Sequence, residues 1–171
     1  MTEIEVKIPV QDPEGLKKKL LALGAVLRRE RFREENTLYD FDGQPLFHQR
    51  EALRLRKEGQ KAFLTFKGPC QKSRHFKIRE EFETEVKNLK HTKKILRALG
   101  LRPSFSYGKY RTIFKKNRLK VCLDETPIGA FLELEGERSD IVRFAKALGF
   151  SRRDFIKKDY IQLLKEKADA T

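Results

Sequence analysis

The chain opens with a stretch, EIEVKI (residues 3–8), in which charged and aliphatic residues alternate. Successive side chains of a β-strand point to opposite faces, so this alternation predicts a strand with Glu3, Glu5 and Lys7 on one face. The aliphatic face is expected to pack on a core. The other face carries two carboxylates and an ammonium group where a solvated strand would ordinarily carry Thr or Ser. This charged face needs a physical explanation.

The same alternation recurs along most of the chain. Further strands are predicted at residues 36–41, 52–57, 62–68, 75–86, 107–116, 118–125 and 130–137. Their charged faces hold Arg54, Arg56, Lys67, Arg79, Glu81, Glu83, Glu85, Lys109, Arg111, Lys120, Asp124, Glu133 and Glu135. A sheet with one solvated face would explain any single strand. Carboxylates gather on some strands and cations on others, however, which favours a closed barrel with the charges inside and helices covering its apolar outer face.

Three short segments read as amphipathic helices: residues 16–24, 92–100 and 143–150. The first two, LKKKLLALG and TKKILRALG, resemble each other, and all three carry a Gly at or near the end, as a helix C-cap does. A fourth helix is predicted at 156–167. The repeat predicts one α+β domain over residues 1–171 built from two similar halves, about 1–86 and 87–165, with a frayed C-terminal tail at 166–171.

Composition limits the cellular setting and the partners. No apolar run is long enough to span a bilayer, the N-terminus does not read as a signal peptide, and Cys70 and Cys122 fit neither a metal site nor a disulfide framework. We therefore expect a cytoplasmic protein with two reduced thiols. The net charge of +14 indicates a polyanionic partner, which could be nucleic acid, an acidic membrane or a phosphorylated small molecule.

Charged side chains inside a barrel indicate a bound ligand, because buried charge is costly unless it is paired or neutralised by a ligand. Carboxylate oxygens suit Mg²⁺ or Mn²⁺, whereas Arg and Lys suit phosphate oxygens. Both together suit a metal–polyphosphate complex. On this hypothesis Glu3 and Glu5 hold the metal ion and Lys7 contacts phosphate.

The ordered set of motifs resembles the CYTH superfamily, the triphosphate tunnel metalloenzymes. EIEVK matches its ExExK signature, and the resemblance continues to about residue 165 through the motifs ENTLYD, ALRLRK, LTFKGP, R-x-E-x-E at 79–83, KYR, LDETP, LELEG and DYIQLL. The resemblance implies an eight-stranded antiparallel β-barrel, the triphosphate tunnel, formed by two related halves with helices packed outside.

The resemblance also implies roles for individual residues. The implied metal ligands are Glu3, Glu5, Asp124, Glu133 and Glu135, with Glu81 and Glu83 on a tunnel-lining strand whose role varies among members. The implied substrate-binding residues are Lys7, Arg54, Arg56, Lys67, Arg79, Lys109, Arg111 and Lys120. Of these residues, Glu3, Glu5, Lys7 and Arg111 are expected to be catalytic. One of Lys157 and Lys158 is expected to reach the tunnel, whereas His48 and His75 are interpreted as ordinary loop or strand-edge residues.

Members of this superfamily differ in chemistry. Class IV adenylyl cyclases convert ATP to cyclic AMP and pyrophosphate, and other members hydrolyse thiamine triphosphate or inorganic tripolyphosphate. Val6 and the strand IREEFETEV favour the cyclase-like branch, with Mg²⁺ or Mn²⁺ as cofactor. Triphosphate hydrolysis remains the alternative.

Non-catalytic binding is the alternative of another class, either of polyphosphate or of nucleic acid. Aromatic residues beside Lys109 and Arg111 would suit nucleic acid, but the carboxylates would repel its phosphates, so we do not expect it as the partner. No membrane partner is expected either, because the basic C-terminal helix is predicted to dock on the barrel. The family resemblance is consistent with a homodimer.

Overall fold

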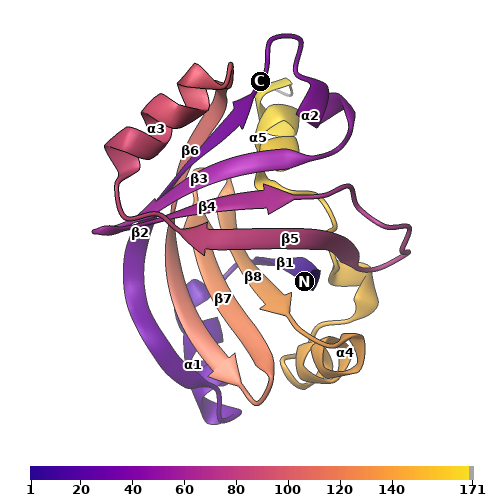
Figure 1. The fold of residues 1–171 in the computed structure, drawn as a ribbon. Coiled ribbons are helices and arrows are strands. Elements are labelled where there is room, and N and C mark those ends of the chain that lie inside the picture. Colours follow the sequence, from indigo (N-terminus) through magenta and orange to yellow (C-terminus); the bar gives the residue numbers. More distant parts are fainter. Residues whose placement is uncertain (170–171) are drawn as a thin grey trace. The chain divides into compact units, whose positions relative to one another are not determined.

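A computed structural model describes residues 1–169 of the chain (Figure 1). Its eight strands form a closed antiparallel β-barrel in the order β1-β5-β4-β3-β2-β6-β7-β8, which confirms the predicted fold class. The strands are β1 (Thr2–Val10), β2 (Val26–Asp40), β3 (Ala52–Glu58), β4 (Lys61–Lys67), β5 (Lys77–Glu85), β6 (Arg102–Lys116), β7 (Leu119–Thr126) and β8 (Gly129–Glu135).

Five α-helices and one 3₁₀ helix accompany the strands of the described chain. They are α1 (Pro13–Ala22), α2 (Pro45–His48), α3 (Leu89–Ala98), α4 (Arg138–Ala147), η1 (Arg152–Asp154) and α5 (Tyr160–Asp169). The last two residues of the predicted tail, 170–171, lie outside the described residues. No described helix has the length and apolar character needed to cross a membrane.

Helices α1 and α3 show why the repeated sequence forms the same structure twice. Each begins after a side chain that caps the first turn: Asp12 accepts a hydrogen bond from Gly15 N, and Asn88 accepts one from His91 N, both at 2.9 Å. Each is followed by a glycine with a positive φ, 76° at Gly24 and 93° at Gly100, where a side chain would be strained. The predicted glycine ends are confirmed, and both helices begin three residues earlier than predicted.

The chain divides into two compact units, which we describe separately. Unit 2 comprises residues 3–31, 72–78 and 110 onward. Its core is formed by the aliphatic positions of its strands, including Val6, Val121 and Leu132, together with Leu20 of α1 and Phe144 of α4. Leu16 and Leu20 of α1, the helix labelled at the bottom of Figure 1, belong to the same core as Val121 of β7. The helices therefore cover the apolar face of these strands, and the charged positions of the same strands lie on the opposite face.

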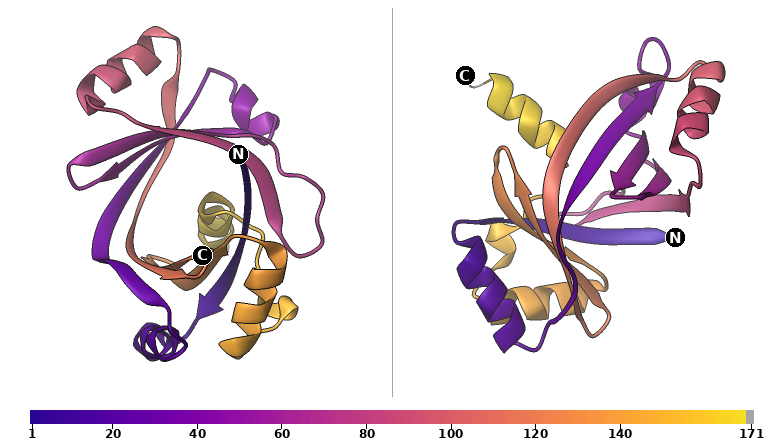
Figure 2. Two further views of the ribbon diagram at one scale, coloured as in Figure 1. Left: turned by 60° about the horizontal axis from the view of Figure 1, so that its bottom comes forward. Right: turned by 90° about the vertical axis from the view of Figure 1, so that its left-hand side faces the viewer.

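Unit 1 comprises residues 1–2, 32–71 and 79–109. The hairpin of β3 and β4 turns at Gly59, between the two predicted strands 52–57 and 62–68, and pairs with β5 and β2. Its smaller core contains Tyr39, Leu55, Leu96 and Leu101. Because Leu96 belongs to α3, this helix covers the apolar face of the unit 1 strands, and Figure 2 shows it outside their sheet.

Candidate active site

In unit 2, six charged side chains form one buried network, which we call the unit 2 network. None of them is more than 7% exposed. The members are Glu5, Lys7, Lys77, Arg111, Asp124 and Glu133. The strand register explains why they meet, because Lys7 of β1 stands opposite Glu133 of β8, and Arg111 of β6 stands opposite Asp124 of β7.

The ion pairs of this network run without interruption from β5 to β7. Nζ of Lys77 lies 3.0 Å from Glu5 Oε1, and Nζ of Lys7 lies 3.2 Å from the same oxygen. Lys7 also contacts Glu133 Oε2 at 3.1 Å. Arg111 donates to both oxygens of Asp124 at 2.6 Å and to Glu133 Oε1 at 2.9 Å. Each cation except Lys77 therefore has two carboxylates as recorded partners.

A tyrosine completes the arrangement around Asp124. The hydroxyl of Tyr160, in the first turn of α5, donates to Asp124 Oδ2 at 2.7 Å. Its ring centroid lies 5.3 Å from Nζ of Lys7 and makes an edge contact with Phe131 at 5.6 Å. Burial, reinforced by Asp124, raises the pKa of Tyr160 well above its ordinary value. The hydroxyl therefore remains a hydrogen-bond donor at physiological pH.

The charges of the unit 2 network balance, with three cations and three carboxylates. Burial by itself would lower the pKa of Lys7, but Glu133 and Glu5 outweigh burial and raise it above the ordinary value. The ammonium group is therefore fully charged at physiological pH. Well-packed apolar residues often stabilise a fold as much as buried ion pairs do. Stability alone therefore does not explain why this buried, neutral and continuous network is present.

Three further residues lie on the same charged face of unit 2. Lys120 pairs with Glu135 at 2.9 Å, half exposed, at the edge of the network. Glu3 shares the face of Glu5 on β1 and is partly buried. Cys122, opposite Glu133 in the register, is 1% exposed, and burial raises the pKa of its thiol to about 12.

Unit 1 has a charged face of its own, on β3, β4 and β5. Arg54 lies 3.6 Å from Glu83, and Arg56 donates to Glu83 at 2.9 Å. Lys67 forms an ion pair with Glu81, and Thr65 donates to Glu83 at 2.7 Å. This group brings together all the cations that the sequence predicts on β3 and β4, each beside a carboxylate of β5.

A second group in unit 1 joins β2 and β6. Lys109 lies 3.6 Å from Glu34, which also accepts a hydrogen bond from Asn36 at 2.9 Å. All three are almost completely buried. Burial would lower the pKa of Arg54, but Tyr107, Glu34, Glu81 and Glu83 together raise it. The guanidinium group is thus held charged within a mainly acidic environment.

Arg79 behaves differently from the other predicted substrate-binding residues. Its guanidinium donates to two backbone carbonyls, Gly68 O at 2.9 Å and Arg50 O at 3.0 Å. These bonds join the ends of β3 and β4 to β5. Arg79 therefore holds the loops of unit 1 in place, and its role in binding substrate stays a prediction.

The carboxylates of the unit 2 network fit a divalent metal ion in their chemistry, because Mg²⁺ and Mn²⁺ prefer oxygen ligands. Among the described residues, however, no group of three Asp, Glu, His or Cys side chains is already gathered around a common point. Lys7 and Arg111 explain this, since they bridge the carboxylates in pairs. A metal ion would have to displace one of these cations.

Several residues of these clusters were not predicted as site residues. Lys77 lies on the same face of β5 as Arg79, and Glu34 and Asn36 share a face of β2, so the period of two contained a signal for all three. Tyr160 gave no such signal, because only the tertiary fold brings α5 to β7.

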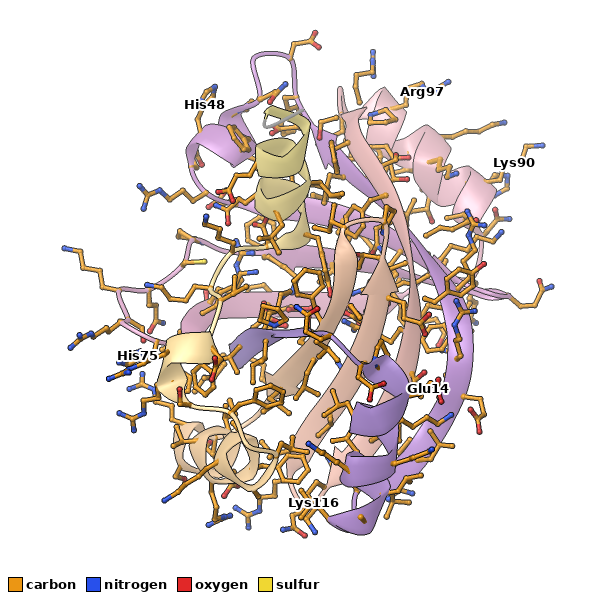
Figure 3. The ribbon with its side chains drawn as sticks, turned by 180° about the vertical axis from the view of Figure 1, so that it is seen from behind. Glu14, His48, His75, Lys90, Arg97 and Lys116 are labelled. Atoms are coloured by element: carbon orange, nitrogen blue, oxygen red, sulfur yellow. The ribbon has the colours of Figure 1, made fainter. Side chains whose placement is uncertain are left out.

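Other residues considered from the sequence lie elsewhere. Lys157 donates to Ser73 O at 2.7 Å, and Lys158 pairs with Glu166, so both are engaged at exposed positions. Figure 3 shows His48 on α2, where its ring packs against Phe47, and His75 on the segment before β5. Neither histidine belongs to a described group of metal-ligating side chains.

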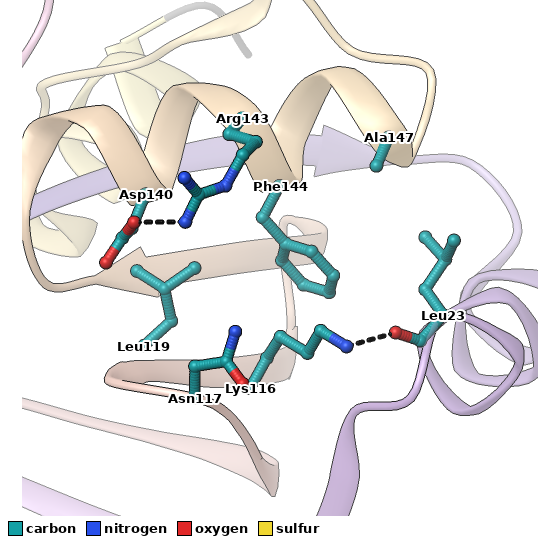
Figure 4. Close-up of a pocket in the computed structure, with 8 residues that line it drawn as sticks. All are labelled: Leu23, Lys116, Asn117, Leu119, Asp140, Arg143, Phe144 and Ala147. Carbon is teal, nitrogen blue, oxygen red and sulfur yellow. Dashed lines mark hydrogen bonds and ion pairs between the residues drawn. The ribbon is translucent and has the colours of Figure 1, made fainter.

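Unit 2 also has a hollow on its helix-covered side, shown in Figure 4. Its walls are mainly apolar, with Leu119 and Phe144 among them. Two cations line it, and both are occupied: Lys116 donates to Leu23 O at 2.6 Å, and Arg143 pairs with Asp140. None of the predicted site residues lines this hollow.

Comparisons with known proteins identify the family. A model of the CYTH domain matches residues 1–163. A protein of Methanocaldococcus jannaschii named "Putative adenylate cyclase MJ0240" is 30% identical over 174 residues, which cover 95% of this chain and 98% of that protein.

Solved structures show the same fold. A protein of Vibrio parahaemolyticus, described as a putative adenylate cyclase, matches with a TM-score of 0.87 at 20% identity, covering 96% of this chain and 98% of its own. The protein HpAC1 from Hippeastrum, whose description reports a dominant triphosphatase activity, matches with a TM-score of 0.70 at 16% identity, covering 97% and 95%. With the family model spanning nearly the whole sequence, the chain belongs to the CYTH domain family.

Proposed function

We propose that this protein is a divalent-metal-dependent enzyme acting on a triphosphate, with conversion of ATP to cyclic AMP and pyrophosphate as its reaction. The observation that carries the proposal is the unit 2 network, six buried charges on the strand face opposite the core. The relative named as an adenylate cyclase supports the choice of reaction.

The chemistry of the unit 2 network suits a metal–triphosphate complex better than either component alone. A divalent cation by itself adds positive charge to a network that is already neutral, and a triphosphate by itself adds negative charge. Together the metal ion offsets part of the triphosphate's negative charge, so that carboxylates can take the metal ion while the cations they release take phosphate oxygens. We therefore expect metal and triphosphate to bind cooperatively.

In this proposal Glu5, Asp124 and Glu133 hold the metal ion, with Glu3 and Glu135 beside them. When bound, the ion supplies Lewis-acid neutralisation of charge on the phosphates. Lys7 and Arg111 contact non-bridging phosphate oxygens, and their charge stabilises the transition state of phosphoryl transfer. Tyr160 fixes the orientation of Asp124.

The cations of unit 1 that the sequence predicts as substrate-binding are also proposed to bind phosphate oxygens. Arg54, Arg56, Lys67 and Lys109 each lie beside a carboxylate that keeps them charged and in a defined position. Glu81 and Glu83, predicted from the sequence as metal ligands, accept ion pairs from these cations and are proposed mainly to orient them.

Two reactions are compatible with such a site. In a cyclase the ribose 3′-hydroxyl attacks the α-phosphate and pyrophosphate leaves, whereas in a hydrolase water attacks the terminal phosphate. The same cations serve both, because both spread negative charge over phosphate oxygens. Hydrolysis of tripolyphosphate or thiamine triphosphate is the second candidate, favoured by the description of the Hippeastrum protein.

The test is product analysis of the purified protein with Mg²⁺ or Mn²⁺ and, separately, ATP, thiamine triphosphate or tripolyphosphate. Cyclic AMP with pyrophosphate is the expected result, and it should disappear in Glu133→Gln. Glu30→Gln is the matched control, since Glu30 is an exposed carboxylate of unit 2 that pairs only with Lys17 in the described chain. Orthophosphate without cyclic AMP would assign the hydrolase reaction, and no turnover of any substrate would leave a non-catalytic polyphosphate binder.

We also propose a cytoplasmic location, which the two free cysteines of the described chain support. We further propose that the protein is a homodimer. Light scattering coupled to gel filtration will measure the mass, and a value near the monomer's 20.1 kDa would exclude the dimer.

A further inference from the structure

Helix α3 of unit 1 presents a surface that the proposed reaction does not use. We call it the α3 surface. It consists of the exposed side chains of α3 and its two flanks, together with Phe41, the residue that directly follows β2. It combines positive charge with exposed aliphatic groups on a single short helix.

The α3 surface is strongly basic. Six Lys and Arg residues and no Asp or Glu occur between positions 87 and 102. All six are exposed: Lys87, Lys90, Lys93, Lys94, Arg97 and Arg102. None of them forms an ion pair with any residue in the described part of the chain, and Figure 3 shows Lys90 and Arg97 extending from α3. The charge of this surface is therefore available to an external anion.

Its apolar residues are equally unusual. Ile95 is 58% exposed and Leu99 is 65% exposed, whereas Leu96 between them is only 5% exposed and packs in the core of unit 1. Residues four apart lie on the same side of a helix, so Ile95 and Leu99 form one strip. Phe41, 41% exposed, lies beside its end, because a Cβ on Gly100 would be 3.7 Å from Cδ1 of Phe41. Unit 1 thus covers only part of the helix's apolar face.

The positive charge and the exposed aliphatic side chains together limit which class of partner can bind the α3 surface. A second copy of the chain would bring like charges together, which opposes self-association through this surface. Nucleic acid would engage the cations but would leave the aliphatic strip in water, since aliphatic side chains offer no stacking surface to bases. An anionic lipid surface accommodates both, with phosphates against the cations and the aliphatic strip at the acyl boundary.

We propose that the α3 surface binds peripherally to anionic phospholipid membranes. From the sequence we expected no membrane partner, because the basic C-terminal helix was predicted to dock on the barrel. The exposure of Ile95 and Leu99 on α3 could not be read from their spacing. Peripheral contact needs no spanning helix. The proposal is independent of the reaction catalysed, because none of these residues belongs to the charged faces described above.

The test is co-sedimentation of the full chain with vesicles of phosphatidylcholine alone or of phosphatidylcholine with about one-third phosphatidylglycerol. Binding to the anionic vesicles only is expected. The triple variant Lys90→Gln, Lys93→Gln, Lys94→Gln should bind roughly 100-fold more weakly, on the scale of anionic lipid attraction for single basic residues. Ile95→Ser with Leu99→Ser should weaken binding roughly 10-fold, because apolar burial contributes separately.

The matched control removes the same number of charges elsewhere, from the exposed Lys18, Lys19 and Lys146 of unit 2. Near-normal binding of this control is expected. An equal loss in the control would show that net charge alone is responsible and would overturn the proposal. Two other results would also overturn it. If the Ile95 and Leu99 changes left binding unaffected, the surface would be reassigned to a hydrophilic polyanion such as RNA. If those changes abolished dimerisation, the surface would be reassigned to a contact between two copies of the chain.

Discussion

The hydroxyl of Tyr160 should stabilise the fold through Asp124, and Tyr160→Phe isolates this one interaction. The substitution removes the hydrogen bond of 2.7 Å but keeps the ring against Phe131. Hydrogen bonds to charged groups contribute about 1.5–3 kcal/mol. Asp124 is 0% exposed but retains both bonds from Arg111, so the lower end applies and we expect a loss of about 1.5 kcal/mol.

Urea denaturation followed by circular dichroism measures this loss, which corresponds to a decrease in Tm of about 4 °C for a chain of this size. Tyr39→Phe is the matched control, because Tyr39 is also 4% exposed but donates no recorded hydrogen bond in the described chain. The free energy of unfolding should change by less than about 0.5 kcal/mol in Tyr39→Phe. Equal effects of the two substitutions would refute the role assigned to the Tyr160 hydroxyl.

Three further predictions concern the unit 2 network and the two thiols. Arg111→Met should destabilise the protein by roughly 3 kcal/mol in urea, since it removes the buried guanidinium group that Asp124 and Glu133 share, and added Mg²⁺ should restore part of the loss; no response to Mg²⁺ would count against carboxylate ligation. Iodoacetamide should alkylate the exposed Cys70 in the native protein but Cys122 only after unfolding, as mass spectrometry of the peptides will show, because burial raises the pKa of Cys122 to about 12. Stability should decrease above about pH 10. The pKa values of Lys7 and Tyr160 are raised in the folded state, so the folded state keeps protons that the unfolded state releases. A urea midpoint unchanged between about pH 8 and pH 10.5 would contradict this.

Much of the fold was predictable because the barrel strands alternate so regularly. Strands β3, β4, β7 and β8 lie within about two residues of their predicted positions. Strand β2 is far longer than predicted, since it begins at Val26 and its first half, rich in Arg and Glu, has no aliphatic alternation. The helix starts were predicted late, because the capping residues Asp12 and Asn88 precede the first apolar position.

Alternation also predicted which residues share a face, but it could not predict which of them pair. That Lys7 of β1 also contacts Glu133 of β8 depends on the register of these two strands. That Arg79 binds backbone carbonyls depends on loop positions. Both facts belong to tertiary structure, as does the approach of Tyr160. The predicted roles of the site residues in metal and substrate binding remain to be tested.

The most direct test of the proposed site is calorimetric titration of the full chain with tripolyphosphate, with and without Mg²⁺. Mg²⁺ alone should bind weakly, because Lys7 and Arg111 already occupy the carboxylates, and Mg²⁺ with tripolyphosphate should bind much more tightly. Arg111→Met should reduce the latter affinity at least about tenfold, the effect of losing one charged hydrogen-bonding group. If Mg²⁺–tripolyphosphate bound equally well to Arg111→Met, or did not bind at all, the unit 2 network would not be the triphosphate site.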